Sequence, residues 1–248
     1  DTRRFPEPTR VQDRYSLRCA PHVIGVLVDC LPFTRGLIET ELNGANDNPL
    51  LDPSTGDILH GGNFYGGHVC SAMDLLKTNV ANLSDLLDRQ MLLLCNPNTN
   101  NGLSENLVST DAGVAHHGFK AMQILTSALA AESAKLSMPA SVFSRSTENH
   151  NQDKVSMGTI AARDCLRMVE LGETVAAAHL LALCQAFDLR EGLGCQGRSK
   201  KLRDQVRENV PMNQADRRMD LDIQHTLGRL RRGELDFGVV DYSGKPSD

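Results

Sequence analysis

Apolar side chains recur every three or four residues over a long stretch near the middle of the chain. The first such stretch consists of Val69, Met73, Leu76, Val80, Leu83, Leu87 and Leu94. This spacing puts the side chains on one face of an α-helix, because residues three and four apart are neighbours on a helix surface. Similar stretches run from Val114 to Met138, before Pro139, and from about Val155 to Leu189. Three long helices are therefore predicted.

The residue types available for a core also favour helices. Aromatic residues make up 4% of the 248 residues and tryptophan is absent, so a core must be built from Leu, Ala, Val, Met and Ile. These side chains suit close packing of helices better than a β-sandwich. No strand-like alternation persists along the sequence, and no internal repeat is present. We therefore predict an all-α fold in which long helices pack as a bundle. Because such helices bury more than one face, we expect the chain to associate with copies of itself.

Proline, glycine and asparagine divide the rest of the chain. A helix is expected from about Ala20 to Leu42, because Pro21 can occupy its first turn without losing a hydrogen bond. Pro32 should kink this helix. The remaining expected segments are polar loops at 43–63 and 144–153 and short helices near 199–209 and 220–233.

The two ends of the chain are interpreted separately from this helical part. Residues 1–10 contain Pro and Arg and are interpreted as a linker or the start of a fragment. The chain begins at Asp1 without Met, so we expect a further segment to precede it. Residues 11–238 are predicted to form one helical portion, and residues 239–248 a flexible tail.

Charge and cysteine usage restrict the class of protein. The net charge of −5 gives no reason to expect nucleic acid or an anionic membrane as a partner. Basic residues gather between Arg198 and Arg232, but they alternate with acids and lack stacking aromatics, so we interpret them as solvated helix faces. The seven cysteines include no Cys-x-x-Cys pair, and the sequence contains no signal peptide and no apolar run of membrane length. A cytoplasmic protein is expected.

Residues 12–19 form the first group of polar residues that could bind a ligand or take part in catalysis. If they are helical, Gln12, Tyr15 and Arg18 lie along one face. If Pro21 instead opens a helix, Arg18 lies just before the helix N-terminus, where a bound carboxylate would meet both the guanidinium and the helix dipole. Arg18 is therefore a candidate carboxylate clamp. The alternative is a structural salt bridge from Arg18 to Asp13 or Glu39, acids at other positions in the same region.

Two further polar groups follow. Residues 46–50 and 60–67 combine asparagines with paired glycines, which allow backbone to approach a ligand closely, and Phe64 could stack on a planar group. The asparagines could equally satisfy buried loop amides. Residues 148–153 place many donors and acceptors at a helix entry, where Asp153 could cap a helix that begins near Val155. Capping explains Asp153 but not the other polar side chains.

A metal site is not expected. His116 and His117 are adjacent and could not face one site from a helix, and His60 and His68 lack the spacing of a zinc-binding helix. The sequence also has no nucleophile elbow and no phosphate-binding glycine loop.

Taken together and in this order, these groups resemble the family of ammonia-lyases that act on histidine, phenylalanine and tyrosine, together with the related aminomutases. The matching stretches are residues 11–19, 46–50, 60–64, 151–157 and 184–192. The similarity spans nearly the whole chain, from Val11 to about Leu235. Five ordered motifs carry far more weight than any one of them.

The resemblance implies an all-α homotetramer whose long central helices form a shared bundle, with active sites built from several subunits. In this family an internal Ala-Ser-Gly tripeptide cyclises into a methylideneimidazolone (MIO) electrophile. This group activates the loss of ammonia together with a weakly acidic β-proton, which gives an α,β-unsaturated acid. No ordinary side chain could overcome the low acidity of that proton alone.

The resemblance also assigns roles to residues that match the motifs. Tyr15 would lie close to the electrophile and act in catalysis, and Arg18 would bind the substrate carboxylate. The other residues expected in the substrate pocket are Gln12, Asn63, Phe64, Glu148 and Gln152. We expect Tyr15, Arg18, Phe64 and Gln152 to face a common cavity.

The sequence departs from the family in two ways. It contains no Ala-Ser-Gly tripeptide, so MIO is expected from a missing N-terminal half, and this C-terminal half alone is predicted to be inactive. In addition, Gln152 stands where histidine-specific members have Glu. A neutral amide pairs less well with an imidazolium, which favours a phenylalanine or tyrosine type of substrate over histidine. The alternatives are an aminomutase and a non-catalytic helical paralogue or scaffold that lacks the electrophile.

Overall fold

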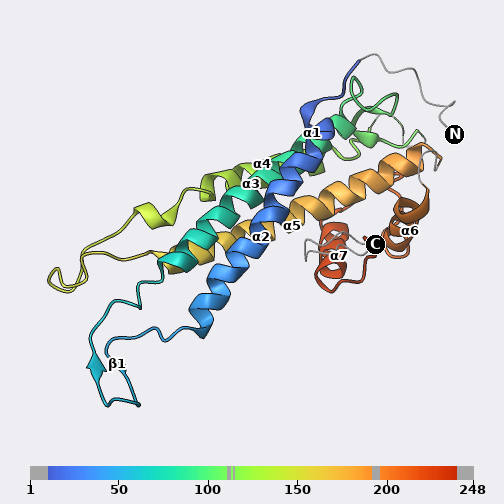
Figure 1. The fold of residues 1–248 in the computed structure, drawn as a ribbon. Helices are drawn as coiled ribbons and strands as arrows, with labels where there is room; N and C mark the ends of the chain where they lie inside the picture. Colours follow the sequence, from blue (N-terminus) through green and yellow to red (C-terminus); the bar gives the residue numbers. More distant parts are fainter. Residues whose placement is uncertain (1–10, 111–112, 114, 192–195, 239–248) are drawn as a thin grey trace.

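A computed structural model describes residues 11–110, 113, 115–191 and 196–238. The two ends interpreted from the sequence as linker and tail, residues 1–10 and 239–248, lie outside the described residues. Four long helices dominate the structure (Figure 1): α2 (Ala20–Asn43), α3 (Gly67–Cys95), α4 (Lys120–Leu136) and α5 (Gly158–Leu189). The prediction of a mainly helical fold is confirmed.

Helix α3 is central, because it packs against α2, α4 and α5. Successive long helices run in opposite directions, so α3 and α5 run parallel to each other, and α4, which lies between them in the sequence, runs the opposite way (Figure 1). The contact between α3 and α5 is close: a Cβ atom added at Gly172 would lie 3.1 Å from the Ser84 hydroxyl. Gly172 thus lets two parallel helices approach each other.

We name the two ends of the bundle by what they contain. At the loop end lie residues 44–66 and 137–157, which connect the long helices and extend beyond them (Figure 1). At the core end lie the short helices α1 (Tyr15–Arg18), α6 (Gly197–Arg207) and α7 (Asp220–Arg231) and the 3-10 turn η2 (Glu105–Leu107).

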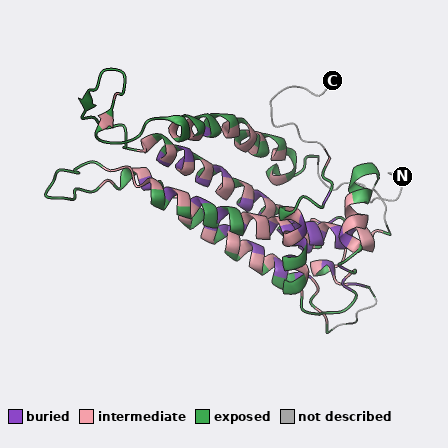
Figure 2. Cartoon of the chain, turned by 90° about the horizontal axis from the view of Figure 1, so that it is seen from below, coloured by how far each residue is buried: buried purple, intermediate pink, exposed green. Residues whose placement is uncertain are grey.

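The main apolar core lies at the core end. It is formed by the C-terminal halves of α3 and α5, the first turns of α4, and α6 and α7. Its largest fully buried members include Phe119, Met91, Leu107 and Leu181. At the loop end the buried apolar cluster contains Cys70, Ala140 and Ala161. In Figure 2 the buried residues accordingly gather near the short helices, while the two long loops are exposed.

Charged groups attach the short helices to α5. The carboxylate of Asp188, whose side chain is 4% exposed, accepts hydrogen bonds from Arg207 Nε at 2.7 Å and from Arg203 Nε at 2.8 Å. Arg229 is also buried and donates to the carbonyl of Gln205. The interpretation of the late basic residues as solvated helix faces was therefore wrong for Arg207 and Arg229. Arg207 donates hydrogen bonds to an aspartate that is distant in sequence, and Arg229 donates to a backbone carbonyl.

Several predicted boundaries shift for identifiable reasons. Helix α4 begins at Lys120 rather than Val114, which lies outside the described residues, because Gly118 has a positive φ of 54° and leaves no helical path. Helix α5 begins after Met157, which has a φ of 61°. Asp153 does not cap this helix, since Met157 occupies the N-cap position without a side-chain cap.

The first long helix agrees with the prediction, whereas the loop after it differs in detail. Helix α2 has Pro21 in its first turn and contains Pro32 in its interior. The loop after α2 contains a small antiparallel hairpin of β1 (Leu50–Leu51) and β2 (Ile58–Leu59). These strands are too short to produce a recognisable alternation of apolar and polar residues in the sequence. Among the described residues, no helix combines the length and hydropathy that a membrane span requires.

Candidate active site

The structure places the predicted site residues in two groups. Tyr15 and Arg18 form α1 at the core end, and Gln12 precedes them. The other predicted residues, Asn63, Phe64, Glu148 and Gln152, lie in the two loops at the loop end. Helix α2 separates the groups by its 24 residues, or about 36 Å at 1.5 Å per residue. One chain therefore does not bring Tyr15, Arg18, Phe64 and Gln152 into a common cavity.

The core-end group is built on a short helix that leads directly into α2. Arg18 ends α1, and Cys19 is the N-cap of α2, so the Arg18 side chain begins next to a helix N-terminus. Its guanidinium carbon lies 4.6 Å from the centre of the Tyr15 ring, a cation–π contact. The amide of Gln90 donates to the carbonyl of Ser16 at 2.8 Å and anchors α1 to α3.

Arg18 does not have the structural role that was its alternative. It forms no ion pair with Asp13 or Glu39, both of which belong to the described part of the chain, and Glu39 instead accepts from Arg35 Nε at 2.7 Å. Arg18 and Tyr15 are both exposed. An exposed guanidinium beside a helix N-terminus can bind a carboxylate.

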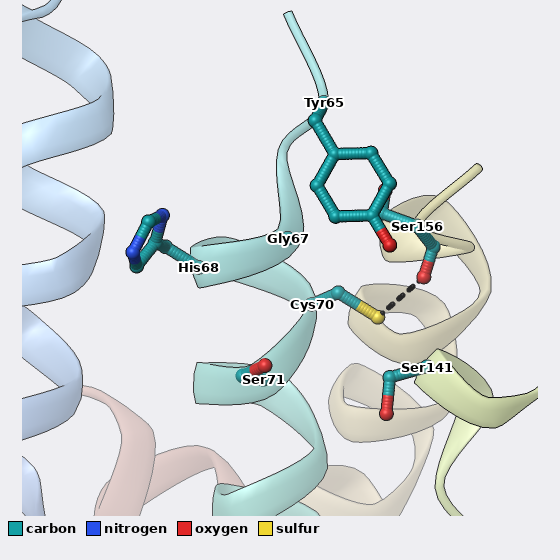
Figure 3. A pocket seen from close by; sticks show the side chains of 7 residues that line it. All are labelled: Tyr65, Gly67, His68, Cys70, Ser71, Ser141 and Ser156. Carbon is teal, nitrogen blue, oxygen red and sulfur yellow. Dashed lines mark hydrogen bonds between the residues drawn. The ribbon is translucent and has the colours of Figure 1, made fainter. Parts of the chain in front are cut away.

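At the loop end, a cavity of about 250 Å³ opens where α3 and α5 begin (Figure 3). We call it the loop-end cavity. Its lining residues are Tyr65, Gly67, His68, Cys70, Ser71, Ser141 and Ser156. They come from the start of α3, from the turn η3 (Ala140–Val142) and from the segment before α5.

Backbone conformation shapes this cavity. Gly66 and Met157, the N-cap residues of α3 and α5, both have left-handed φ angles, of 66° and 61°. The ring of Tyr65 covers the start of α3 so closely that a Cβ atom on Gly67 would lie 2.5 Å from Tyr65 Cε1. Only glycine accepts this position of the ring. Tyr65 was missed by the sequence analysis, which chose the neighbouring Phe64.

The polar groups of the cavity are mostly neutral donors. None of its seven lining residues is an acid, a lysine or an arginine. The thiol of Cys70 donates to the carbonyl of Ser156 at 2.9 Å, and burial raises the pKa of Cys70, so the group is a donor rather than a thiolate nucleophile. Because α3 and α5 both start here, their first-turn amides favour a ligand atom with partial negative charge.

Glu148 and Gln152 belong to a tight turn that extends beyond the bundle. Thr147 and Gln152 exchange two backbone hydrogen bonds, of 2.9 and 3.2 Å. Between them Glu148, Asn149 and His150 all have positive φ angles, of 51°, 53° and 67°. Three consecutive left-handed non-glycine residues are costly. Neither Glu148 nor Gln152 lines the loop-end cavity.

Asn63 and Phe64 lie just before Tyr65 in the neighbouring loop. Both are exposed, and 54% of Phe64 is open to solvent. Neither lines the loop-end cavity of the single chain.

The expectation for His116 and His117 needs a correction. They lie in a turn before α4, not in a helix, and their Nδ1 atoms lie 3.8 and 3.6 Å from the carboxylate of Asp216. Adjacent residues can face one group in a turn. The Nδ1 atom of His116 already accepts a hydrogen bond from the Asp216 amide at 3.0 Å. Within the described ranges, no three histidine, cysteine or acidic side chains are grouped as metal ligands.

Comparisons with known proteins identify the family to which the chain belongs. The sequence model of the aromatic amino acid lyase family matches residues 3–208. A tyrosine ammonia-lyase from Cupriavidus metallidurans is 39% identical over 91% of this chain and 42% of its own length. Most of this chain therefore has a counterpart in that enzyme, but most of that enzyme has none here.

Two solved structures have the same fold. Histidine ammonia-lyase from Trypanosoma cruzi superposes with a TM-score of 0.85 and 35% identity, over 90% of this chain and 44% of that one. Tyrosine aminomutase from Streptomyces globisporus superposes with a TM-score of 0.83 and 37% identity, over 94% of this chain and 45% of that one. The chain thus spans less than half the length of each relative.

The chain belongs to the aromatic amino acid lyase family. This family uses MIO.

Proposed function

We propose that this chain is the C-terminal portion of an MIO-dependent ammonia-lyase, which eliminates ammonia from an aromatic L-amino acid to give an α,β-unsaturated acid. The observation that carries the proposal is the Arg18 guanidinium, exposed beside the first turn of α2 without an ion pair to Asp13 or Glu39. A carboxylate bound there would receive two parallel hydrogen bonds from the guanidinium and would meet the positive end of the helix dipole.

Tyr15 is the catalytic group of this half-site in our proposal. Its ring lies 4.6 Å from the Arg18 guanidinium carbon, so a substrate held by Arg18 also lies near the Tyr15 hydroxyl. A phenol can donate a hydrogen bond to, or exchange a proton with, a group beside it. Gln12, three residues before Tyr15 in the chain, would add an amide to the same pocket.

The complete site must combine different chains in this proposal, because α2 holds the two groups of residues about 36 Å apart. Helix α2 supports such an assembly, since among the long helices of the described chain it packs only against α3. Large apolar side chains on its surface, such as Ile24, Val26 and Phe33, are between 42% and 61% exposed. We propose that a homotetramer covers them and forms a shared core of long helices.

The loop-end cavity is suited to a group such as MIO. Its hydroxyl groups, on Tyr65, Ser71, Ser141 and Ser156, and the starts of two helices can donate to the carbonyl oxygen of a planar polar ring. Phe64 would pack beside that ring. MIO supplies an electrophile that activates the loss of ammonia and of the β-proton. It would come from the N-terminal half, because this chain has no Ala-Ser-Gly sequence.

Gln152 and Glu148 select the substrate side chain in the proposal. Thr147 Oγ1 donates to Gln152 Oε1 at 3.3 Å, which leaves the Gln152 amide group as a neutral donor for a ligand. A neutral amide suits a phenyl or phenol group better than an imidazolium. We therefore favour phenylalanine or tyrosine over histidine as the substrate.

A cytoplasmic location fits Cys70, Cys95 and Cys165, which are buried thiols without disulfides.

The test is co-expression of this chain with an N-terminal half that carries Ala-Ser-Gly. The assembled protein is mixed with phenylalanine, tyrosine or histidine, and the ultraviolet absorbance of cinnamate, coumarate or urocanate is followed. We expect cinnamate or coumarate to form, and no product from this chain alone. An assembled tetramer that turns over none of the three amino acids contradicts the proposal and supports a non-catalytic paralogue.

An aminomutase is the second candidate, favoured by the superposition on tyrosine aminomutase at 37% identity. Such an enzyme returns ammonia to the β-carbon of the unsaturated acid. Chromatography of the same reactions distinguishes the two candidates, because β-amino acid would accumulate beside the unsaturated acid only with an aminomutase.

A further inference from the structure

Lys77 is buried in the middle of the bundle although lysine is rarely found there. Its side chain is 0% exposed, and its ammonium group lies 2.7 Å from the carbonyl of Met138, 3.0 Å from Asp74 Oδ1 and 3.8 Å from Asp164 Oδ2. A buried ammonium without such partners would be strongly unfavourable. Lys77 therefore depends on one carbonyl and two carboxylates, which come from three different segments.

Asp74, one helical turn before Lys77, binds the same region of the chain as Met138. Its Oδ1 accepts from the amide of Ala140 and its Oδ2 from the amide of Ser141, both at 3.0 Å. Pro139, between Met138 and Ala140, has no amide hydrogen to donate. Two side chains of α3 thus bind three backbone groups of the turn 138–141: the carbonyl of Met138 and the amides of Ala140 and Ser141.

The hydrogen bonds of Asp74 and Lys77 fix the orientation of the turn 138–141 on α3 as well as its distance from the helix. The buried apolar cluster at the loop end contains three small residues, Cys70, Ala140 and Ala161, with the partly buried Met73 and Met157 packed against it. Apolar contacts of this size can slide, whereas charge-assisted hydrogen bonds from both oxygens of one carboxylate fix the orientation of the amides they bind. A buried ion pair is often no more stabilising than apolar residues of the same volume.

The turn held in this way forms one wall of the loop-end cavity. The backbone amide of Ser141 donates a hydrogen bond to Asp74. The side chain of the same residue lines the cavity, together with Tyr65 and Ser156 (Figure 3). Asp74 and Lys77 themselves do not line the cavity.

We propose that Asp74 and Lys77 are a positioning pair, which holds the turn 138–141 on α3 and thereby sets the place of the Ser141 hydroxyl in the loop-end cavity. The consequence for catalysis rests on the proposed function, in which this cavity receives the electrophilic ring. The pair acts through Ser141, and neither of its members touches the substrate.

The first experiment needs no activity. Amide hydrogen exchange at Ala140 and Ser141 is measured in the chain and in the variants Lys77→Met and Asp74→Asn. Each variant removes hydrogen bonds to a charged group, so exchange at these two amides should accelerate by at least about tenfold, the smallest effect expected of such a bond. Lys77→Arg, which keeps the charge, should stay close to wild type, and Lys135→Met is the matched control at an exposed lysine of α4.

The second experiment separates positioning from stability. In the assembled enzyme, Lys77→Met should lower kcat with little change in KM, by roughly ten- to a hundredfold, because small displacements in a site cost that much. The same change made in a Ser141→Ala background should have almost no further effect, since the group being positioned is absent.

Three outcomes decide the proposal. Accelerated exchange together with loss of the Lys77→Met effect in the Ser141→Ala background supports it. Unchanged exchange at both amides overturns it, as does an equal loss of kcat in both backgrounds. If Lys77→Met does not fold, Asp74→Asn, which keeps the side-chain shape, gives the same comparison. Absence of turnover in the wild-type assembly counts against the proposed function only, because hydrogen exchange still tests the pair.

Discussion

The two ends of the bundle are stabilised in different ways. At the core end, apolar side chains from α3, α4, α5, α6 and α7 form one continuous core. At the loop end, three small residues are buried together, and the turn 138–141 depends on Asp74 and Lys77. The core end is therefore completed by the chain itself, while the loop end is defined by polar contacts and keeps a cavity.

This difference follows from what each kind of interaction can do. Apolar burial stabilises in proportion to the area removed from water, but it has no direction. Hydrogen bonds to buried charges add less net stability but fix the orientation of the groups they join. We infer that the core end supplies most of the stability of the chain, and that the loop end supplies a defined geometry.

The largest effect is expected for Leu181→Ala in α5, where the side chain is 1% exposed within the core. Removal of a buried leucine side chain should lower the free energy of unfolding by about 2–5 kcal/mol. Leu51→Ala in the loop-end hairpin is the control, because Leu51 is 71% exposed and its loss should cost less than about 0.5 kcal/mol. Urea denaturation measures both values, and equal losses would refute the comparison.

A second prediction concerns the half-site at the core end. In the assembled enzyme, Arg18→Ala should lower kcat/KM by at least about tenfold, because truncation of one partner of a charge pair costs on the order of 2–5 kcal/mol. Arg35→Ala is the control, since Arg35 is an exposed arginine of α2 that pairs with Glu39. An unchanged kcat/KM in Arg18→Ala would show that this arginine does not bind substrate.

The same variant tests whether each site combines both ends. Chains with Arg18→Ala are assembled together with chains that carry Gln152→Ala. If a site takes its core-end residues from one chain and its loop-end residues from another, some mixed sites contain both intact groups and activity returns. Activity no higher than in either variant alone would place both groups of one site in the same chain.

The smallest effect is expected from Asp74 and Asp88, two aspartates of α3 whose pKa values are shifted in opposite directions. Burial opposes ionisation of Asp74, but hydrogen bonds from the amides of Ser141 and Ala140 outweigh it and lower its pKa. Burial raises the pKa of Asp88, and the Thr126 hydroxyl only partly offsets this. An unfolded aspartate has a pKa of about 3.9. Asp74 therefore stabilises the fold above about pH 3.9 and loses this contribution as the pH falls through its lower folded pKa.

Asp88 has the reverse effect on stability. Its contribution becomes less favourable as the pH rises from about 3.9 through its raised pKa. Asp88→Asn should consequently increase the free energy of unfolding at pH 7, while Asp74→Asn decreases it. Chemical denaturation at several pH values measures the two slopes, and slopes of the same sign would contradict the assignment.

The fold could be predicted from the sequence where the information is local. The spacing of Val69 to Leu94 is sufficient to identify α3, because a helix depends on residues three and four apart. The start of α4 could not be predicted in this way. The amides of His117 and Gly118 are bound by Asp216, a residue about one hundred positions later.

The candidate site shows the same limit. Arg18 and Tyr15 could be identified together because they are three residues apart. Lys77 could not, since beside Asp74 it resembles an ordinary surface pair, and its buried position depends on Met138 and Asp164. The separation of the predicted residues between two ends follows from the direction of each helix, which no local pattern specifies.

The parallel course of α3 and α5 has a consequence for biosynthesis. Residues that meet across this contact, such as Lys77 and Asp164, leave the ribosome far apart in time, because the whole of α4 is made between them. Until α5 has emerged, the face of α3 that it covers is open to other nascent chains. Chaperones that bind exposed apolar surface should therefore retain this chain during its synthesis until residues near Leu189 are available.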